Sequence, residues 1–141
     1  MLRSFLFALF LTLSSFAATA EPLSSSDKME FQRIITAQIG AFRADDGQAA
    51  YGYAAPVVRK IFPTSDVFMA MVKQGYPQVY RPQSFAFNDT LIDPLGRPAQ
   101  KVTIVGPDGK TYIAIYTMER QPDGTWLISG CTMAQIPGVD A

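Results

Sequence analysis

The chain has 141 residues, with 12 basic and 12 acidic side chains, so its formal net charge at pH 7 is zero. Nucleic-acid binding needs a basic face and docking on anionic lipid needs basic clusters, so the balanced charge argues against both. The sequence has no histidine, which excludes Ser-His-Asp and Cys-His catalytic systems within one chain and removes the commonest zinc ligand. We therefore expect no nucleic-acid partner, no metal and no cofactor.

The first twenty residues have the pattern of a secretory signal peptide. Met1-Leu2-Arg3 is a positive start, residues 4–16 form an apolar run, and Ala18-Thr19-Ala20 is a small-x-small cleavage site. This order predicts cleavage between Ala20 and Glu21 and an exported protein, periplasmic or secreted. A retained membrane anchor is the alternative, but the apolar run is short for a bilayer span.

Cleavage would leave 121 residues (141 − 20), which is enough for one domain with its own core. We expect residues 21–26 to form a flexible lead, residues 27–136 a single α+β domain, and residues 137–141 a tail. No later apolar run is long enough to span a bilayer, so we expect no membrane contact after signal removal.

Cys131 is the only cysteine, so no disulfide can form within the chain. The domain must therefore be stable through its core alone. Two interpretations of Cys131 stay open, a small buried hydrophobe and a reactive or intermolecular thiol.

A long helix is the first element expected in the domain. Asp27, with Glu30 three positions later, resembles a capping box and predicts a helix start. The apolar residues that follow recur at three- and four-residue spacing and define one helix face, formed by Phe31, Ile34, Ile35, Ile39 and Phe42. The helix is expected to end near Asp45-Asp46-Gly47.

Three shorter helical segments are expected next. The first covers residues 48–53, and the second covers residues 57–62 and directly follows a proline that suits a first helical turn. Thr64 or Ser65 is expected to cap the third segment, and Gly75 is expected to end it in a left-handed conformation.

After residue 77 the apolar period changes from nearly four to two, which indicates strands. Pro82 near the start of the first strand implies an edge or a bulge. Two Pro-Asp-Gly turns, at residues 107–109 and 122–124, indicate consecutive antiparallel hairpins. The expected strands cover residues 79–92, 100–105, 110–119 and 125–133.

Helices followed by strands favour an α+β fold, with the N-terminal helices packed on a curved antiparallel sheet of about four strands. In the last strand, alternation assigns Trp126 and Ile128 to one face and Leu127, Ser129 and Cys131 to the other. The last strands carry apolar residues on both faces, so one face is expected to meet the helices and the other to be available to a partner.

Several segments resemble a known family of exported bacterial proteins, the domain of unknown function 4864. They are residues 38–46, 50–56, 68–72 with 75–76, 79–82 and 121–131. The resemblance covers roughly residues 31–133. It implies a cone-shaped α+β fold similar to nuclear transport factor 2 and to cystatin-like proteins. It implies no activity, and no catalytic position of ketosteroid isomerase, which shares that fold, matches this chain by a local motif.

The candidate ligand-binding residues are mainly aromatic. Tyrosines and a tryptophan could line an apolar cavity that holds a few hydroxyl groups, as small-ligand sites do; ordinary core and sheet packing is the alternative. The set is Asp45, Tyr53, Tyr76, Tyr80, Arg81, Tyr116 and Trp126.

The charged members of this set have two interpretations each. Asp45 or Asp46 could place a carboxylate at a pocket mouth, with its pKa raised by apolar neighbours. The alternative, which we favour, is that one aspartate caps the next helical turn and the other is solvated. Arg81 could bind an anionic ligand, but we favour its pairing with Asp45 or Asp46.

From these features we expect a non-enzymatic exported module. It would bind a small apolar ligand inside the cone, or a partner protein on the exposed sheet face, where a homodimer could also form. The alternative function is a small enzyme that uses carboxylate and tyrosine proton transfer in the cone pocket. No catalytic residue is assigned.

Overall fold

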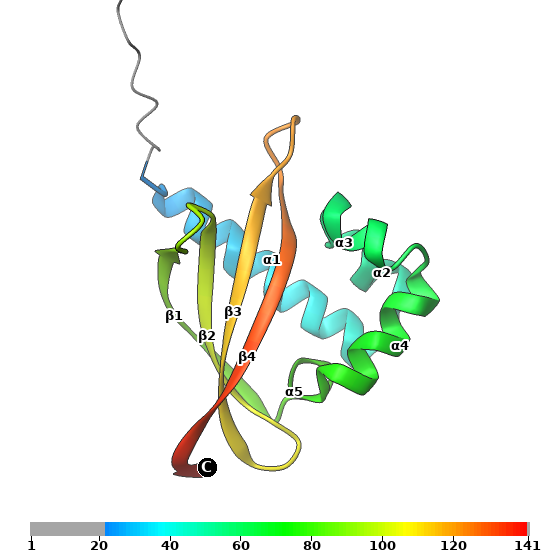
Figure 1. Ribbon diagram of the computed structural model, residues 1–141, viewed down its shortest axis with the longest axis vertical. Helices are drawn as coiled ribbons and strands as arrows, with labels where there is room; N and C mark the ends of the chain where they lie inside the picture. The colour runs from blue at the N-terminus through cyan, green and yellow to red at the C-terminus, as the bar shows by residue number, and fades with distance from the viewer. Residues whose placement is uncertain (1–21, 141) are drawn as a thin grey trace, which may run out of the picture.

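The computed structural model describes residues 22–140, and the predicted signal peptide with its cleavage site at Ala20 and Glu21 lies outside the described residues. Helices come first and an antiparallel sheet of order β1-β2-β3-β4 follows (Figure 1). This arrangement confirms the predicted α+β class and the curved four-stranded sheet. The elements are α1 (Ser25–Arg43), α2 (Gly47–Gly52), α3 (Pro56–Ile61), α4 (Ser65–Gly75), α5 (Pro77–Tyr80), β1 (Ser84–Ile92), β2 (Pro98–Val105), β3 (Lys110–Arg120) and β4 (Trp126–Asp140).

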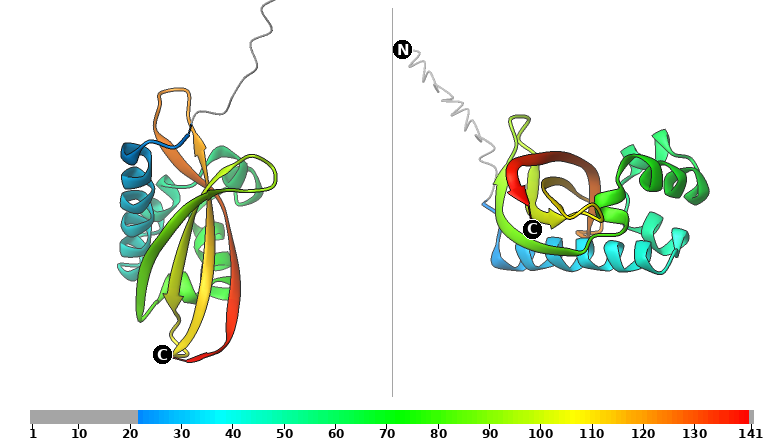
Figure 2. Two further views of the ribbon diagram at one scale, coloured as in Figure 1. Left: turned by 90° about the vertical axis from the view of Figure 1, so that its left-hand side faces the viewer. Right: turned by 90° about the horizontal axis from the view of Figure 1, so that it is seen from below.

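Helix α1 crosses one face of the sheet, and α2, α3 and α4 gather beyond the β4 edge (Figure 1). Seen along the strands, the sheet curls strongly above α1 (Figure 2). The whole predicted apolar face of α1 is buried, which confirms that prediction. Its side chains meet the inward residues of the two central strands, chiefly Val102, Ile104, Ala114, Tyr116 and Met118.

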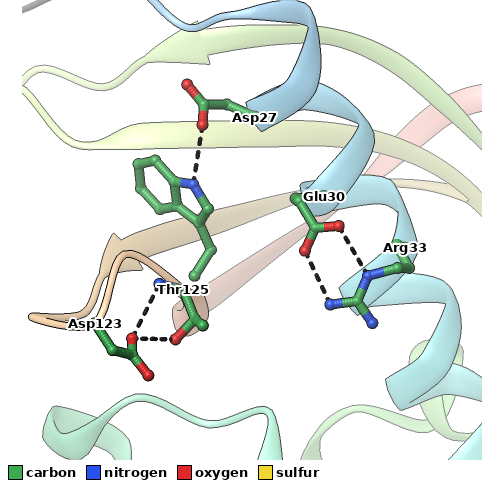
Figure 3. A network of polar contacts seen from close by, with 6 residues as sticks. Asp27, Glu30, Arg33, Asp123 and Thr125 are labelled. Carbon is green, nitrogen blue, oxygen red and sulfur yellow. Dashed lines mark hydrogen bonds and ion pairs between the residues drawn. The ribbon is translucent and has the colours of Figure 1, made fainter.

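The residue that caps the start of α1 lies three positions earlier than predicted, at Ser24 instead of Asp27. The Ser24 hydroxyl accepts a hydrogen bond from the Asp27 N–H (3.0 Å), and the Asp27 carboxylate accepts one from the Ser24 N–H (3.1 Å). The capping box is therefore Ser24 with Asp27, and the predicted pair of Asp27 with Glu30 is wrong. Glu30 instead forms an ion pair with Arg33 on the helix surface (Figure 3).

Asp27 also connects the start of α1 to the β3–β4 hairpin. One carboxylate oxygen accepts a hydrogen bond from the Trp126 indole N–H (3.2 Å) (Figure 3). The same oxygen accepts one from the Arg120 guanidinium (3.1 Å). The Trp126 ring packs edge-to-face on Phe31 at 4.9 Å between centroids. The Asp27 carboxylate thus both caps the helix and fixes it to the sheet. Its negative charge strengthens each of these hydrogen bonds.

The two Pro-Asp-Gly turns form as predicted. Gly109 and Gly124 have φ angles of 76° and 86°, which only glycine adopts freely. In each turn the aspartate side chain accepts the N–H of the residue that follows the glycine, Lys110 and Thr125 respectively. The turns therefore hold β2–β3 and β3–β4 in the antiparallel register.

Three boundaries differ from the prediction. Gly75 is the last residue of α4 but has no positive φ, because the Tyr76 N–H closes the final turn on the Val72 carbonyl. The first strand starts at Ser84, after Pro82, and not at residue 79 as predicted. The short helix α5 occupies the chain before the proline. Strand β4 continues to Asp140, so the expected tail pairs with β3 at Lys110.

A bulge near the middle of β4 changes which residues face the core. The pairing with β3 passes from Met118↔Ile128 to Thr117↔Gly130, so Ser129 has no partner of its own. An extra residue in one strand reverses the alternation beyond it. The predicted face of Cys131 is therefore wrong: Cys131 lies on the inner side with Ile128 and packs against the core.

Replacing Asp27 with alanine should destabilise the fold by about 1–2 kcal/mol, because the helix cap and the charged hydrogen bonds to the hairpin are both lost. Hydrogen bonds from Ser24 hold the pKa of Asp27 below its usual range. A carboxyl group whose pKa is lower in the folded state contributes stability above its unfolded pKa, and loses that contribution as the pH falls through the folded pKa. Urea unfolding at neutral and acidic pH measures the difference.

The matched control is Asp66→Ala, which removes an acidic residue from the first turn of α4. It should cost only a few tenths of a kcal/mol, the helix-dipole contribution of an exposed charge. If Asp27→Ala and Asp66→Ala lower stability equally, or if the Asp27 effect persists unchanged at acidic pH, the assigned role of Asp27 is wrong.

Candidate functional site

A short backbone pairing attaches the helical group to the edge of the sheet. The Ala55 N–H donates to the Ile128 carbonyl (2.8 Å), and the Ile128 N–H donates to the Tyr53 carbonyl (2.8 Å). Ala54 and Ile128 thus form a parallel β-bridge between the α2–α3 connection and β4. Each bond satisfies a backbone group of the edge strand, which would otherwise be unpaired there.

Arg59 of α3 stabilises the same connection. Its guanidinium donates to the carbonyls of Ala54 (3.0 Å), Tyr51 (3.1 Å) and Gly52 (3.3 Å). The guanidinium also lies over the Tyr51 ring, 4.9 Å from its centroid. A cation at the C-terminal end of α2 is favourable, because the last carbonyls of a helix have no partners within it.

A cavity of about 300 Å³ lies between the helical group and the inner side of β3 and β4. Helices α1, α3, α4 and α5 with the connections next to them supply most of its wall, and Tyr116 of β3 and the bulged part of β4 supply the rest. Figure 1 shows α3 and α4 together on the β4 side of the sheet. The lining residues are Gln38, Phe42, Ala54, Val58, Ile61, Phe62, Phe68, Met71, Val72, Tyr76, Val79, Tyr116, Ile128, Ser129, Gly130 and Cys131.

The cavity wall is apolar and uncharged. Within the described part of the chain, no Asp, Glu, Lys or Arg side chain lines it. Gln38 is the largest polar side chain in the wall, and its amide N–H donates to the Ala50 carbonyl (3.1 Å). That bond fixes the orientation of the amide, because a carbonyl oxygen can accept only from the nitrogen.

Tyr116 is the most unusual residue of the wall. It is only 1% exposed, and its hydroxyl has no hydrogen-bond partner among the described residues. Burial raises its pKa well above the usual value, and the neighbouring Cys131 raises it further. Few buried polar groups lack a partner, so this hydroxyl is an exceptional group in the cavity wall.

Cys131 lies opposite Tyr116 on the adjacent strand. The residue as a whole is half-buried, but burial of its thiol raises the pKa to about 12. The thiol is therefore protonated at neutral pH and is a poor nucleophile. This favours the interpretation of Cys131 as a buried hydrophobe over that of a reactive thiol.

Only two of the seven predicted residues, Tyr76 and Tyr116, line the cavity. Tyr53 is part-buried against the core and contributes its carbonyl to the bridge. Trp126 lies at the opposite end of α1, where it binds Asp27.

Asp45, Tyr80 and Arg81 form a separate cluster on the surface. The Tyr80 hydroxyl donates to Asp45, and the Arg81 guanidinium donates to the same carboxylate (3.0 Å) and lies over the Tyr80 ring. The favoured pairing of Arg81 with Asp45 is thus confirmed. Asp46 caps α2 by accepting the Ala49 N–H (3.1 Å), which confirms the favoured capping role.

Of the two interpretations of Asp45, the one with a raised pKa is wrong, and the favoured one without it stands. The hydrogen bond from Tyr80 and the nearby Arg81 charge hold its pKa below the usual range. Its side chain remains 54% exposed, so no apolar wall surrounds it. The described residues contain no group of three potential metal ligands, and none of their helices is both long and apolar enough to cross a membrane.

The sequence did not identify Gln38 or Cys131 as cavity residues. Gln38 occupies a buried position one residue before Ile39, so it extends the inward face of α1. Cys131 could have been identified only by recognising the bulge, for which Gly130 in a strand was a weak signal.

The Cys131 thiol should react with a disulfide reagent about 30- to 60-fold more slowly than a free cysteine at about pH 8. Raising the pKa from 9 to about 12 reduces the thiolate fraction about 1000-fold, and the higher nucleophilicity of the more basic thiolate recovers part of that loss. Unfolding in denaturant should restore the full rate. Native labelling as fast as that of free cysteine would contradict the burial of the thiol.

Two solved structures share the fold at low sequence identity. One is a protein of unknown function with a cystatin-like fold from Nostoc punctiforme, with a TM-score of 0.55 and 12% identity over 84% of this chain and 98% of that chain. The other is ActVI-ORFA from Streptomyces coelicolor, with a TM-score of 0.52 and 12% identity over 83% of this chain and 100% of that chain. Both likenesses show the fold alone.

No curated protein matches the chain significantly. A family model, described as domain of unknown function (DUF4864), matches residues 24–141, which is nearly all of the described chain. Together with the helix-then-sheet architecture of the cystatin-like and nuclear transport factor 2-like cone, this match shows that the chain belongs to the DUF4864 family.

Proposed function

We propose that this protein is a non-enzymatic binding module that takes a small apolar ligand into the cavity between its helices and the sheet. The observation that carries the proposal is the cavity itself, about 300 Å³ in volume and lined by aromatic and aliphatic side chains. This volume lies at the lower end of the range for small-molecule sites. A few polar groups in an apolar wall are typical of such sites.

Export is part of the same proposal. It is supported by the order of charge, apolar run and small-residue exit in residues 1–20. An exported carrier or sensor would meet its ligand outside the cytoplasm, in the periplasm or the medium.

The contacts of Asp45 favour binding over carboxylate catalysis. An acid–base pair of Asp45 with Tyr80 needs a carboxylate that can gain and lose a proton beside a bound substrate. Asp45 is solvent-exposed, is paired with Arg81 and has a lowered pKa. No described carboxylate lines the cavity, so a substrate there would have no such group beside it.

The outer sheet face supports a second candidate, binding of a partner protein or of another copy of the chain. Ile113 and Ile115 of β3 alternate with the buried Ala114 and Tyr116, so they lie on the face away from α1. Both are half-buried rather than fully exposed. The homodimer stays a prediction.

A larger side chain that fills part of the cavity should weaken the binding of a small apolar molecule. Val58→Phe adds bulk to a wall residue of α3, so the affinity for the uncharged fluorescent amine N-phenyl-1-naphthylamine should fall at least tenfold. Val57→Phe is the matched control, because Val57 is 46% exposed on the same helix and does not line the cavity. Fluorescence titration of the three proteins measures the affinities.

Equal affinity of Val58→Phe and Val57→Phe for the dye would contradict binding in this cavity. Absence of dye binding to the wild-type protein would contradict the proposed function itself.

The export proposal makes its own prediction. The intact mass of protein recovered from the exported fraction of its host should correspond to a chain that begins at Glu21. Recovery of the uncleaved chain from the membrane fraction would support the retained anchor instead.

A further inference from the structure

We propose that the natural ligand is uncharged and carries one polar end, which accepts a hydrogen bond from the Tyr116 hydroxyl at the wall of the cavity. This inference rests on the proposed function, and it narrows the ligand to a class such as small alcohols, ketones or amides with an alkyl or aromatic body.

The first argument concerns charge. Within the described chain no charged side chain lines the cavity, and Arg59 of α3 and Arg81, directly after α5, have their partners outside it. Arg59 is held by the carbonyls at the end of α2, and Arg81 by Asp45 and the Phe42 carbonyl. An ionised ligand would therefore lose its water without gaining an opposite charge. Burial of an unpaired charge is far more costly than burial of a neutral polar group.

The second argument concerns Tyr116. Its hydroxyl is shielded from water and has no well-formed hydrogen bond among the described residues; its polar neighbour is the Cys131 thiol, a weak hydrogen-bonding group. In the free protein, a buried polar group without a good hydrogen bond bears the full free-energy cost of losing its contact with water. A ligand atom that accepts this hydroxyl proton would remove the cost on binding, so the bond favours the complex more than an ordinary surface bond would.

The protonation states of Tyr116 and Cys131 determine which partner donates in the hydrogen bond between Tyr116 and the ligand. Burial raises the pKa of Tyr116 and of Cys131, so both keep their protons at neutral pH. Of the two, the phenol is the stronger donor, because a thiol is a weak donor and a weak acceptor. The ligand must then present an acceptor, which carbonyl, ether and hydroxyl oxygens all provide.

The volume limits the size of the ligand. A cavity of about 300 Å³ lies at the lower end of the range for small-molecule sites, so the ligand is no larger than the size class of the dye. An eight-carbon chain with one polar end falls within this limit and can be obtained in neutral, anionic and cationic forms.

Competition with N-phenyl-1-naphthylamine tests the charge argument on the wild-type protein. The competitors are 1-octanol, octanoate and octylammonium, which share the alkyl body and differ in the charge of the polar end. We expect 1-octanol to displace the dye at a concentration at least tenfold lower than either ion. If octanoate or octylammonium competes as well as 1-octanol, the inference of an uncharged ligand is overturned while cavity binding still stands.

Tyr116→Phe tests the hydrogen bond. The variant should bind 1-octanol about five- to tenfold more weakly and should bind the dye as the wild type does. Its thermal midpoint should not fall, and a rise of about 3 °C is expected, because a buried hydroxyl without a partner is removed. A purely structural role would lower stability and leave the preference for 1-octanol unchanged.

Tyr53→Phe is the matched control, since Tyr53 is half-buried against the core but does not line the cavity. Its affinity for 1-octanol should stay within twofold of the wild type. Equal affinity of the wild type and Tyr116→Phe for 1-octanol would overturn the role of Tyr116. Failure of the dye and of all three competitors to bind would instead overturn the proposed function, so the two failures are distinguishable.

Discussion

The pairing of residues 53–55 with Ile128 is the constraint on which the rest of the site depends. Two hydrogen bonds of 2.8 Å attach the helical group to the edge of β4, and the side chain of Ile128 lines the cavity that this attachment creates. The bulge at Ser129 follows immediately and turns Cys131 inward. Backbone geometry at one position therefore sets both the width of the cavity and the chemistry of its wall.

Charged groups are kept at the two ends of α1, away from the cavity. Asp27 fixes the N-terminal end to Trp126 and Arg120, and Asp45 fixes the other end to Arg81 beside α5. Each carboxylate is satisfied by strong donors and remains ionised, so it contributes order rather than proton transfer. The middle of the molecule is left with tightly packed apolar side chains and a few neutral polar groups, an environment suited to a neutral guest.

Much of the fold could be predicted because its signals are local. The apolar period of α1 and the two Pro-Asp-Gly turns indicated the helix and the hairpins, and the structure confirms both. The cavity could not be predicted in the same way, because it depends on a bridge between Ala54 and Ile128, 74 positions apart (128 − 54). Tyrosines alone did not mark it: Tyr80 and Tyr116 have the same side chain, but tertiary packing places one at the surface and the other in the wall.

The measurement that tests the central claim most directly is a titration followed by two-dimensional NMR of backbone amides, with N-phenyl-1-naphthylamine as the probe. Binding in the cavity predicts that the largest shift changes fall on both of its sides, at Val58 and Val72 on the helices and at Cys131 on β4. Changes confined to the outer sheet face around Ile113 and Ile115 would contradict the account and transfer the binding site to that face.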